Sequence, residues 1–182
     1  KTKANNLNNL YEDTLANLIT IKSGYEDILD KLLGNALQNV VSRTKDETRD
    51  LIKFINQNRL GQVTFLPIDS IFASKKEKPN HKEVIAMAYE LVDYENRLSN
   101  IINHFLGSTV VVKNIDDATS LSKKIKGYRI ITLDLDIINA WGSMASGSIK
   151  NKKSQNSIIN RNKKLEESKY EILSLKRERI AI

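Results

Sequence analysis

The feature that most constrains the fold of this chain is an internal repeat. Leu18-Ile19 stands sixteen residues before Gly34, and Leu91-Val92 stands sixteen residues before Gly107. In both spans an amphipathic pattern of helical period ends in Leu-Gly, and glycine commonly stands just past the end of a helix. Each glycine is followed by a β-type run, a capped helix, a further glycine and a short strand. A chain that repeats one supersecondary unit in this way is expected to form two similar α/β halves.

The elements expected in each half follow from local signals. Gly34 ends one helix, and Thr44 with Glu47 three residues later is a capping box that begins the next. In the first half we expect an extended segment, a helix, a β-type run, a helix and a strand at residues 18–21, 25–33, 37–42, 44–58 and 62–66, the second helix being stopped by Gly61. In the second half we expect a β-type run at 109–112, a helix from Asn114 or Asp116, and a strand within 127–133.

A charged linker separates the two halves. Residues 74–83 contain a proline and no apolar residue, which is typical of a connection between packed units. The chain is therefore divided into an N-terminal arm, a first half, the linker, a second half and a C-terminal arm, with bounds at 1–14, 15–73, 74–83, 84–153 and 154–182.

Both ends of the chain carry narrow apolar seams. In residues 3–18, the seam residues recur every three to four positions: Leu7, Tyr11, Thr14 and Leu18. From residue 154 onward they recur every seven positions, at Ile158, Leu165 and Ile172, with Leu175 and Ile182 at companion positions. Such seams fit one partner helix but are too narrow for a core. We expect both ends to be helices that pair as an antiparallel coiled coil. The chain begins without Met and ends inside a helical pattern, so we expect it to be a piece of a longer protein.

The composition narrows the class of protein. At 182 residues, with 40% hydrophobic and 28% charged residues, it is that of a soluble globular domain. The absence of cysteine excludes disulfides and thiolate chemistry and favours a reducing compartment. No apolar run of membrane-spanning length and no leader pattern occurs, so we expect a cytoplasmic protein without a membrane partner. A net charge of +7 favours a polyanionic partner if the charge is clustered.

The basic residues are in part clustered. Residues 150–164 contain six of them and no acid: Lys150, Lys152, Lys153, Arg161, Lys163 and Lys164. A solvated surface is the common alternative for such a run. Because no base-reading or RNA-stacking motif is evident, any nucleic-acid contact here is expected to be made with phosphates and to be independent of sequence.

The stretch 139–150 joins the β-rich unit to this basic tract. It carries Gly142 and Gly147, five positions apart. That spacing resembles a phosphate loop, but Ser148 stands where the motif requires Lys, so a tight turn or an interface strand is the better interpretation. Trp141 beside Gly142 is a candidate hot spot for a protein contact. The alternative is that Trp141 folds back onto its own half.

No set of residues predicts a catalytic or metal site. His81 lies in the linker and His104 in a helical pattern, and neither has another ligand at metal-binding spacing. Asp134 and Asp136 alternate after a predicted strand and could pair for acid–base work. Without a nucleophile or histidine nearby, turn formation at a strand end is favoured. We expect a chain that is not an enzyme and has no small-molecule substrate.

Taken in order, several stretches resemble the hinge domain of bacterial-type structural maintenance of chromosomes (SMC) proteins, over about residues 15–153. In the first half the matching pieces are Tyr25-x-x-x-Leu29, Leu33-Gly34-x-Ala36-Leu37-Gln38-x-Val40-Val41 and Asn58-Arg59-Leu60-Gly61-x-x-Thr64-Phe65-Leu66-Pro67. In the second half they are Leu106-Gly107-x-Thr109-Val110-Val111-Val112, Gly127-Tyr128-Arg129-Ile130-Ile131-Thr132-Leu133 and Gly142-Ser143-Met144. The chain departs from the family's glycine motif at Ala140, Trp141 and Ser146, where the family usually has a proline and glycines.

The resemblance implies an α/β (α+β) globe of two subdomains that pairs with a second, identical hinge. The implied interface is Trp141, Gly142, Ser143, Met144 and Gly147. It also implies coiled-coil arms that run to absent ATPase heads, where ATP and Mg²⁺ would bind, and hence no cofactor in this piece. The implied role is in a chromosome-organising, condensin-type protein of the nucleoid, with DNA contacts made by the six basic residues at the arm root. The rival expectation is a monomeric, small basic α/β nucleic-acid-binding protein, whose terminal helices would carry wide apolar faces.

Overall fold

The computed structural model describes residues 9–147 and 158–180. The first half contains β1 (Tyr11–Thr14), α2 (Leu15–Leu18), β2 (Ile19–Ile21), α3 (Glu26–Leu33), η1 (Gly34–Gln38), β3 (Val40–Ser42), α4 (Lys45–Asn58), β4 (Phe65–Pro67) and η2 (Ile68–Ser70). The second half contains β5 (Val84–Met87), η3 (Ala88–Leu91), β6 (Val92–Tyr94), η4 (Asn96–Leu98), α5 (Ser99–Leu106), β7 (Thr109–Val112), α6 (Ile115–Lys124), β8 (Arg129–Thr132), β9 (Ile137–Ile138) and β10 (Met144–Ala145). The helix α7 (Ile158–Ile180) follows.

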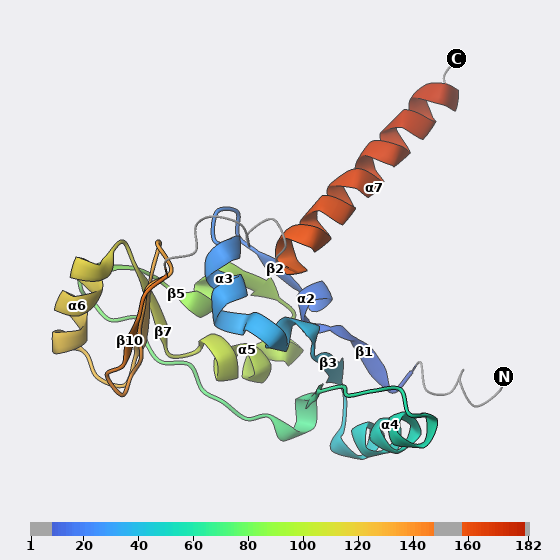
Figure 1. Ribbon diagram of the computed structural model, residues 1–182, viewed down its shortest axis with the longest axis horizontal. Coiled ribbons are helices and arrows are strands. Elements are labelled where there is room, and N and C mark those ends of the chain that lie inside the picture. The colour runs from blue at the N-terminus through green and yellow to red at the C-terminus, as the bar shows by residue number, and fades with distance from the viewer. Residues whose placement is uncertain (1–8, 148–157, 181–182) are drawn as a thin grey trace.

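The predicted repeat is confirmed, and the two halves follow the same path. β3 and β4 are parallel, as are β7 and β8, and β1 and β5 lie antiparallel on the outer sides of β3 and β7. The sheets therefore run β1-β3-β4 in the first half and β10-β9-β8-β7-β5 in the second. The halves meet where β2 pairs antiparallel with β6 (Figure 1). The mixed α/β fold expected from the sequence is thus confirmed.

The helix predicted over residues 3–18 is wrong over Tyr11–Thr14 and confirmed only over Leu15–Leu18. Residues Tyr11–Thr14 form β1, which pairs with β3, and only Leu15–Leu18 are helical. The backbone N–H of Leu15 donates to the carbonyl of Asn39 (2.9 Å), which holds this segment on the first half. Pairing with β3 therefore outweighs the helical spacing of a few side chains. The N-terminal arm predicted at 1–14 includes this strand, and the remainder of that arm, residues 1–8, lies outside the described residues.

Two other predicted elements of the first half are shorter than expected. The β-type run at 37–42 begins as the 3₁₀ turn η1 and becomes a strand only at Val40. The strand predicted at 62–66 is regular only from Phe65 to Pro67. The helix that precedes this strand ends at Asn58 as predicted. The residue that ends it is Arg59, in a left-handed conformation (φ +51°), and not Gly61 as expected.

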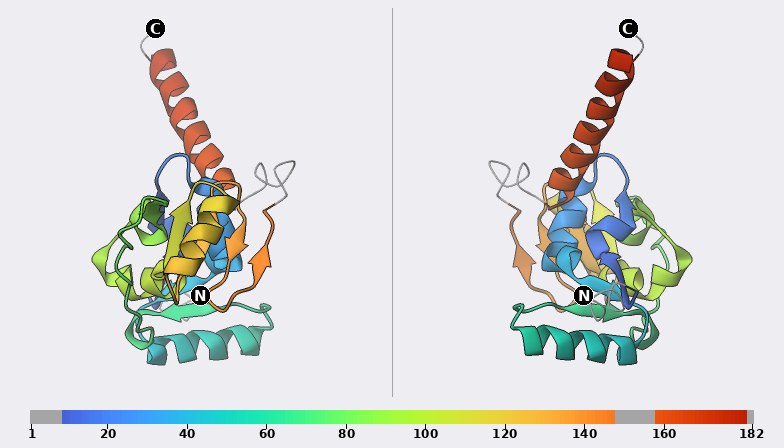
Figure 2. Two further views of the ribbon diagram at one scale, coloured as in Figure 1. Left: turned by 90° about the vertical axis from the view of Figure 1, so that its left-hand side faces the viewer. Right: turned by 90° about the vertical axis from the view of Figure 1, so that its right-hand side faces the viewer.

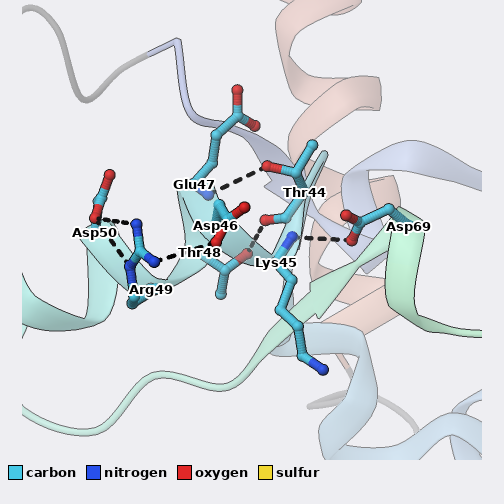
Figure 3. Close-up of polar contacts among 8 residues, drawn as sticks. All are labelled: Thr44, Lys45, Asp46, Glu47, Thr48, Arg49, Asp50 and Asp69. Atoms are coloured by element: carbon cyan, nitrogen blue, oxygen red, sulfur yellow. Dashed lines mark hydrogen bonds and ion pairs between the residues drawn. The ribbon is translucent and has the colours of Figure 1, made fainter.

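Figure 3 shows how α4 begins. The side chain of Thr44 accepts a hydrogen bond from the backbone N–H of Glu47 (3.1 Å), so the Thr44 half of the predicted capping box is confirmed. The carboxylate of Glu47 pairs with Arg43 (3.4 Å). A second acceptor comes from outside the helix, because Asp69 in η2 accepts from the backbone N–H of Lys45 (2.9 Å). Two acceptors therefore satisfy helix-terminal donors that would otherwise need water.

The two halves share one hydrophobic core. Its largest cluster combines Leu15, Leu29 and Leu37 from the first half with Ile102 and Leu106 from the second, all fully buried. Each such side chain contributes about 1.5–3 kcal/mol relative to exposure. A smaller cluster lies between α6 and the second-half sheet. The halves are thus not independent domains in energetic terms, although their chain paths repeat.

The C-terminal helix predicted from residue 154 is confirmed over Ile158–Ile180 as α7. Its first turns contact α2 and α3, where Ile159 packs against the shared core. The rest of α7 projects away from the globe, while α4 lies on the opposite side (Figure 2). The seam residues Leu165, Ile172 and Leu175 are exposed along the projecting part.

Candidate interface and nucleic-acid surface

A turn after β8 directs the chain into the candidate interface. The backbone N–H of Thr132 donates to the carbonyl of Asp136 (2.9 Å), and the side chain of Thr132 accepts from the N–H of Asp136 (3.0 Å). Leu135 occupies a left-handed conformation within the turn (φ +71°). Asp136 is therefore engaged in turn formation, as the sequence predicted.

The interface stretch itself is a β-hairpin. β9 and β10 pair antiparallel, with Met144 opposite Ile138 and Ala145 opposite Ile137. At the tip, the N–H of Asn139 donates to the carbonyl of Ser143 and the N–H of Gly142 donates to that of Asn139, both at 2.9 Å. Gly142 has φ +111°, a conformation that favours glycine. The described part of 139–150 is therefore a tight turn followed by a strand, and the role of that strand as an interface stays a prediction.

β10 is the last strand of its sheet among the described residues. Hydrogen-bonded and non-hydrogen-bonded pairs alternate along an antiparallel ladder. Because Asn139 and Ser143 are hydrogen-bonded, the next pair, Ile138 and Met144, is of the other kind. The backbone N–H and carbonyl of Met144 therefore face the open edge, where nothing in the described chain pairs with β10 on that side.

The side chains of the hairpin are also open to solvent. Trp141 is 83% exposed and Met144 is 58% exposed. The alternative that Trp141 folds back onto its own half is therefore wrong. A large aromatic side chain at a hairpin tip, next to an unpaired strand edge, is a surface suited to a protein contact.

Gly147 plays a different part from the other four predicted interface residues. It is buried, and its N–H donates to the carboxylate of Asp136 (2.8 Å). A Cβ at this position would overlap the backbone of Asp134 and Leu135. Gly147 thus anchors the end of β10 to the turn after β8, whereas Trp141, Gly142, Ser143 and Met144 lie together at the tip and edge. The two glycines also flank a strand, unlike the loop-to-helix turn of a phosphate loop.

The predicted basic cluster is only partly described. Lys150, Lys152 and Lys153 lie outside the described residues, whereas Arg161, Lys163 and Lys164 are exposed near the start of α7. Lys163 forms an ion pair with Glu26 of α3 (3.1 Å), which ties the helix to the globe. Burial acts against the charged form of Glu26, but hydrogen bonds from backbone N–H groups and from Lys163 outweigh it and lower the pKa of that carboxyl.

Other kinds of site find little support in the part of the chain that the structure describes. No cluster of three or more potential metal ligands occurs there. None of the described helices combines the length and apolarity needed to cross a membrane. The side chain of His104 stacks edge-on against Phe105, with 4.9 Å between ring centres.

Comparison with known proteins identifies the fold. The family model described as "SMC proteins Flexible Hinge Domain" matches residues 9–122, which is more than half of the chain. The chain belongs to this family. The hinge resemblance expected from the sequence is therefore confirmed.

Relatives of this hinge domain are large chromosome partition proteins. Chromosome partition protein Smc of Methanocaldococcus jannaschii is 34% identical over 140 residues, covering 77% of this chain and 12% of the relative. The protein of that name from Bacillus subtilis is 31% identical over 157 residues, covering 82% of this chain and 13% of the relative. The hinge chain thus spans only about an eighth of the length of these proteins.

Solved hinge domains have the same fold. The SMC hinge domain of Geobacillus stearothermophilus, solved as an asymmetric dimer, has a TM-score of 0.71 at 30% identity and covers 96% of this chain and 75% of that one. The Pyrococcus furiosus hinge domain has a TM-score of 0.66 at 24% identity, over 82% of this chain and 79% of that one. At 24% identity, the similarity to the Pyrococcus furiosus hinge supports the fold alone.

Proposed function

We propose that this hinge domain joins two copies of the chain and that the β9–β10 hairpin makes the contact. The observation that carries the proposal is the open edge of β10, next to a Trp141 side chain that is 83% exposed. An open strand edge can pair with another chain, and tryptophan is the residue type most enriched at interface hot spots. The Geobacillus stearothermophilus hinge was solved as an asymmetric dimer, which supports the pairing of two hinges here.

The first half offers a complementary surface for a partner's hairpin. β4 is the last strand of the sheet β1-β3-β4 formed by the described residues. The segment before β4 carries Leu60, which is 60% exposed, and the exposed Val63. A two-fold axis makes every contact occur twice. Each hairpin would then lie beside the partner's β4, and two equal contacts would close the dimer.

The wider role follows from the relatives. They are chromosome partition proteins, and we place this hinge in a condensin-type SMC protein of the cytoplasmic nucleoid. It acts by binding, while ATP and Mg²⁺ belong to head domains beyond this piece. α7 would supply one arm, because its exposed seam of Leu165, Ile172 and Leu175 can be covered by a second helix.

DNA contact at the arm root is the second part of the proposal. It rests on the six basic residues from Lys150 to Lys164 that occur without an acid. Three phosphate contacts would lower the affinity for duplex DNA by about 40-fold between about 50 and about 200 mM salt. Fluorescence anisotropy of a labelled duplex over this range tests the contact. An affinity that does not respond to salt contradicts it.

The rival function, a monomeric nucleic-acid-binding protein, requires terminal helices that pack on the globe through wide apolar faces. α7 packs only through its first turns and exposes its apolar side chains beyond them. In a monomer, these apolar side chains would stay exposed to water, and no packing against another helix would offset that exposure. The geometry of α7 therefore favours the hinge.

Sedimentation over a concentration series tests the dimer. The wild-type chain is expected to approach twice 20.7 kDa. Trp141→Ala should weaken self-association by more than about fivefold, or about 1 kcal/mol, since truncation of a hot-spot tryptophan commonly costs more than this. Tyr170→Ala is the matched control, because Tyr170 is another highly exposed aromatic residue, at 71%, and lies on α7 away from the hairpin. An unchanged dissociation constant for Trp141→Ala would refute the proposed contact.

A further inference from the structure

The linker between the halves is fastened to the second half. The backbone N–H of Lys76 donates to the carbonyl of Gly107 (2.8 Å), and the hydroxyl of Tyr89 donates to the carbonyl of Lys76 (3.1 Å). The hydroxyl of Tyr128 donates to the carbonyl of Glu77 (2.9 Å). Gly107 and Tyr128 lie just before β7 and β8. The linker therefore crosses the end of the sheet at which these two parallel strands begin.

This fastening fixes two lysine side chains on aromatic rings. The ammonium of Lys75 lies 5.0 Å from the ring centre of Tyr89, and that of Lys76 lies 4.7 Å from the ring centre of Tyr128. Both distances fall within the range of cation–π attraction. Because the rings restrict the lysine side chains, less conformational entropy remains to be lost when an anion binds.

A third lysine stands next in sequence to a residue that the ammonium of Lys76 approaches. The ammonium of Lys76 comes within 2.5 Å of the position that a Cβ on Gly127 would occupy, and Lys126 is the neighbour of Gly127 in the turn between α6 and β8. Residues 122–130 contain four basic residues and no acid. We call Lys75, Lys76 and Lys126 the strap lysines. All three are exposed.

Two acidic side chains near the strap lysines pair with other lysines, so the strap lysines remain available to bind an anion. Lys78 pairs with Glu90 (3.8 Å), and Lys124 pairs with the buried Glu83. In contrast, none of the ion pairs found among the described residues involves a strap lysine. Glu77, which is exposed in the same segment, is the one acid between Lys75 and Lys82. The local balance is therefore positive.

We propose that the strap lysines form a second phosphate-binding surface for duplex DNA. Gly147, the last described residue before the basic tract, lies at the other end of the same sheet, because it is bonded to the turn that follows β8. A second copy of the chain is a poor occupant, since it too carries a charge of +7. The phosphate backbone of DNA offers dense negative charge and needs no base-reading group. The inference depends on the proposed function only for its choice of DNA as the ligand.

The test is the salt dependence of binding to a short labelled duplex. Lys75→Gln, Lys76→Gln and Lys126→Gln are combined in one variant. Each phosphate contact contributes about 0.9 to the slope of log affinity against log salt. The triple variant should therefore flatten that slope by up to about 2.7 and weaken binding by about tenfold or more at low salt. A matched control combines Lys31→Gln, Lys45→Gln and Lys53→Gln, which remove the same charge from exposed sites in the first half.

Two further variants separate the possible explanations. Lys75→Arg with Lys76→Arg and Lys126→Arg keeps the charge and should restore binding. Lys150→Gln with Lys152→Gln and Lys153→Gln tests the arm root with the strap intact, so the two surfaces can fail independently. An equal loss in the first-half control would overturn the inference, because net charge alone would then explain the binding. A strap variant that binds like wild type, or that loses the dimer in sedimentation, would also overturn it.

Discussion

The two halves repeat the same chain path but finish their sheets differently. In the second half, β8 is flanked by β9 and then β10, whereas in the first half β4 is the last described strand. β7 is also buried along its whole length, while only the central residue of β4 is buried. The repeat thus provides the shared core, and the hairpin is an addition to one copy. In the described chain, the outer edge of β4 therefore has no neighbouring strand, whereas the equivalent edge of β8 is covered by β9.

The largest expected effect concerns the core that the halves share. Leu33 and Leu106 occupy equivalent positions before Gly34 and Gly107, and both are buried in the same cluster. Leu33→Ala and Leu106→Ala should each lower the free energy of unfolding by about 2–5 kcal/mol. Urea unfolding followed by circular dichroism should show one transition for each variant. Two separate transitions would show that the halves fold independently and would contradict a common core.

Helix caps should give a smaller effect that differs between the halves. Thr44 and Asn114 cap the equivalent helices α4 and α6. Asn114→Ala should cost about 1–2 kcal/mol, and Thr44→Ala about 0.5–1 kcal/mol. The second value is smaller because Asp69 still accepts from the N–H of Lys45 (2.9 Å). Thermal unfolding measures both variants. In Asp69→Ala, the cost of Thr44→Ala should rise to that of Asn114→Ala, and an unchanged cost would remove this explanation.

Removal of the hairpin's outward N–H should change assembly while leaving stability almost unaltered. Proline is tolerated on edge strands when its missing N–H faces away from the sheet. Met144→Pro should therefore weaken the dimer in sedimentation, and Met144→Val is the control that retains the N–H. If Met144→Pro dimerises like Met144→Val, the open edge of β10 is not the contact.

The smallest expected effect is confined to acidic solution and to the second half. The hydrogen bond from Lys124 is the main cause that lowers the pKa of Glu83 from 4.5 to about 2. A lowered pKa gives stability that is present above pH 4.5 and is lost as the pH falls toward 2. Glu83→Gln should remove this part of the acid dependence. Unfolding curves between these pH values measure it, and an unchanged slope would show that the pair does not act in this way.

The repeat could be predicted from the sequence because each of its elements is specified by residues close together in the chain. Leu-Gly pairs, N-caps such as Asn114 and β-branched runs such as Val110–Val112 specify their own structure. β1 was missed because its strand character comes from pairing with β3, which is distant in sequence. The repeat itself contained the signal, since β5 stands before β6 as β1 stands before β2.

The candidate site was only partly predictable. Gly142 and Trp141 marked the tip of the hairpin, and the change to basic residues marked the approach to α7. The edge position of β10 depends on the order of strands in the folded sheet, which no local pattern specifies. The strap lysines were missed for the same reason. Lys76 approaches Gly127, the residue after Lys126, only because Tyr128 and Gly107 hold the linker in place.

The central claim is that the edge of β10 becomes a contact between two chains. Amide hydrogen exchange at Met144, measured by NMR over a concentration series, tests it most directly. The N–H of Met144 faces solvent in a single chain and should exchange quickly when the protein is dilute. It should become protected at concentrations where the sedimentation mass doubles, because the partner then accepts its hydrogen bond. Fast exchange at Met144 in a chain that has fully dimerised would contradict the account.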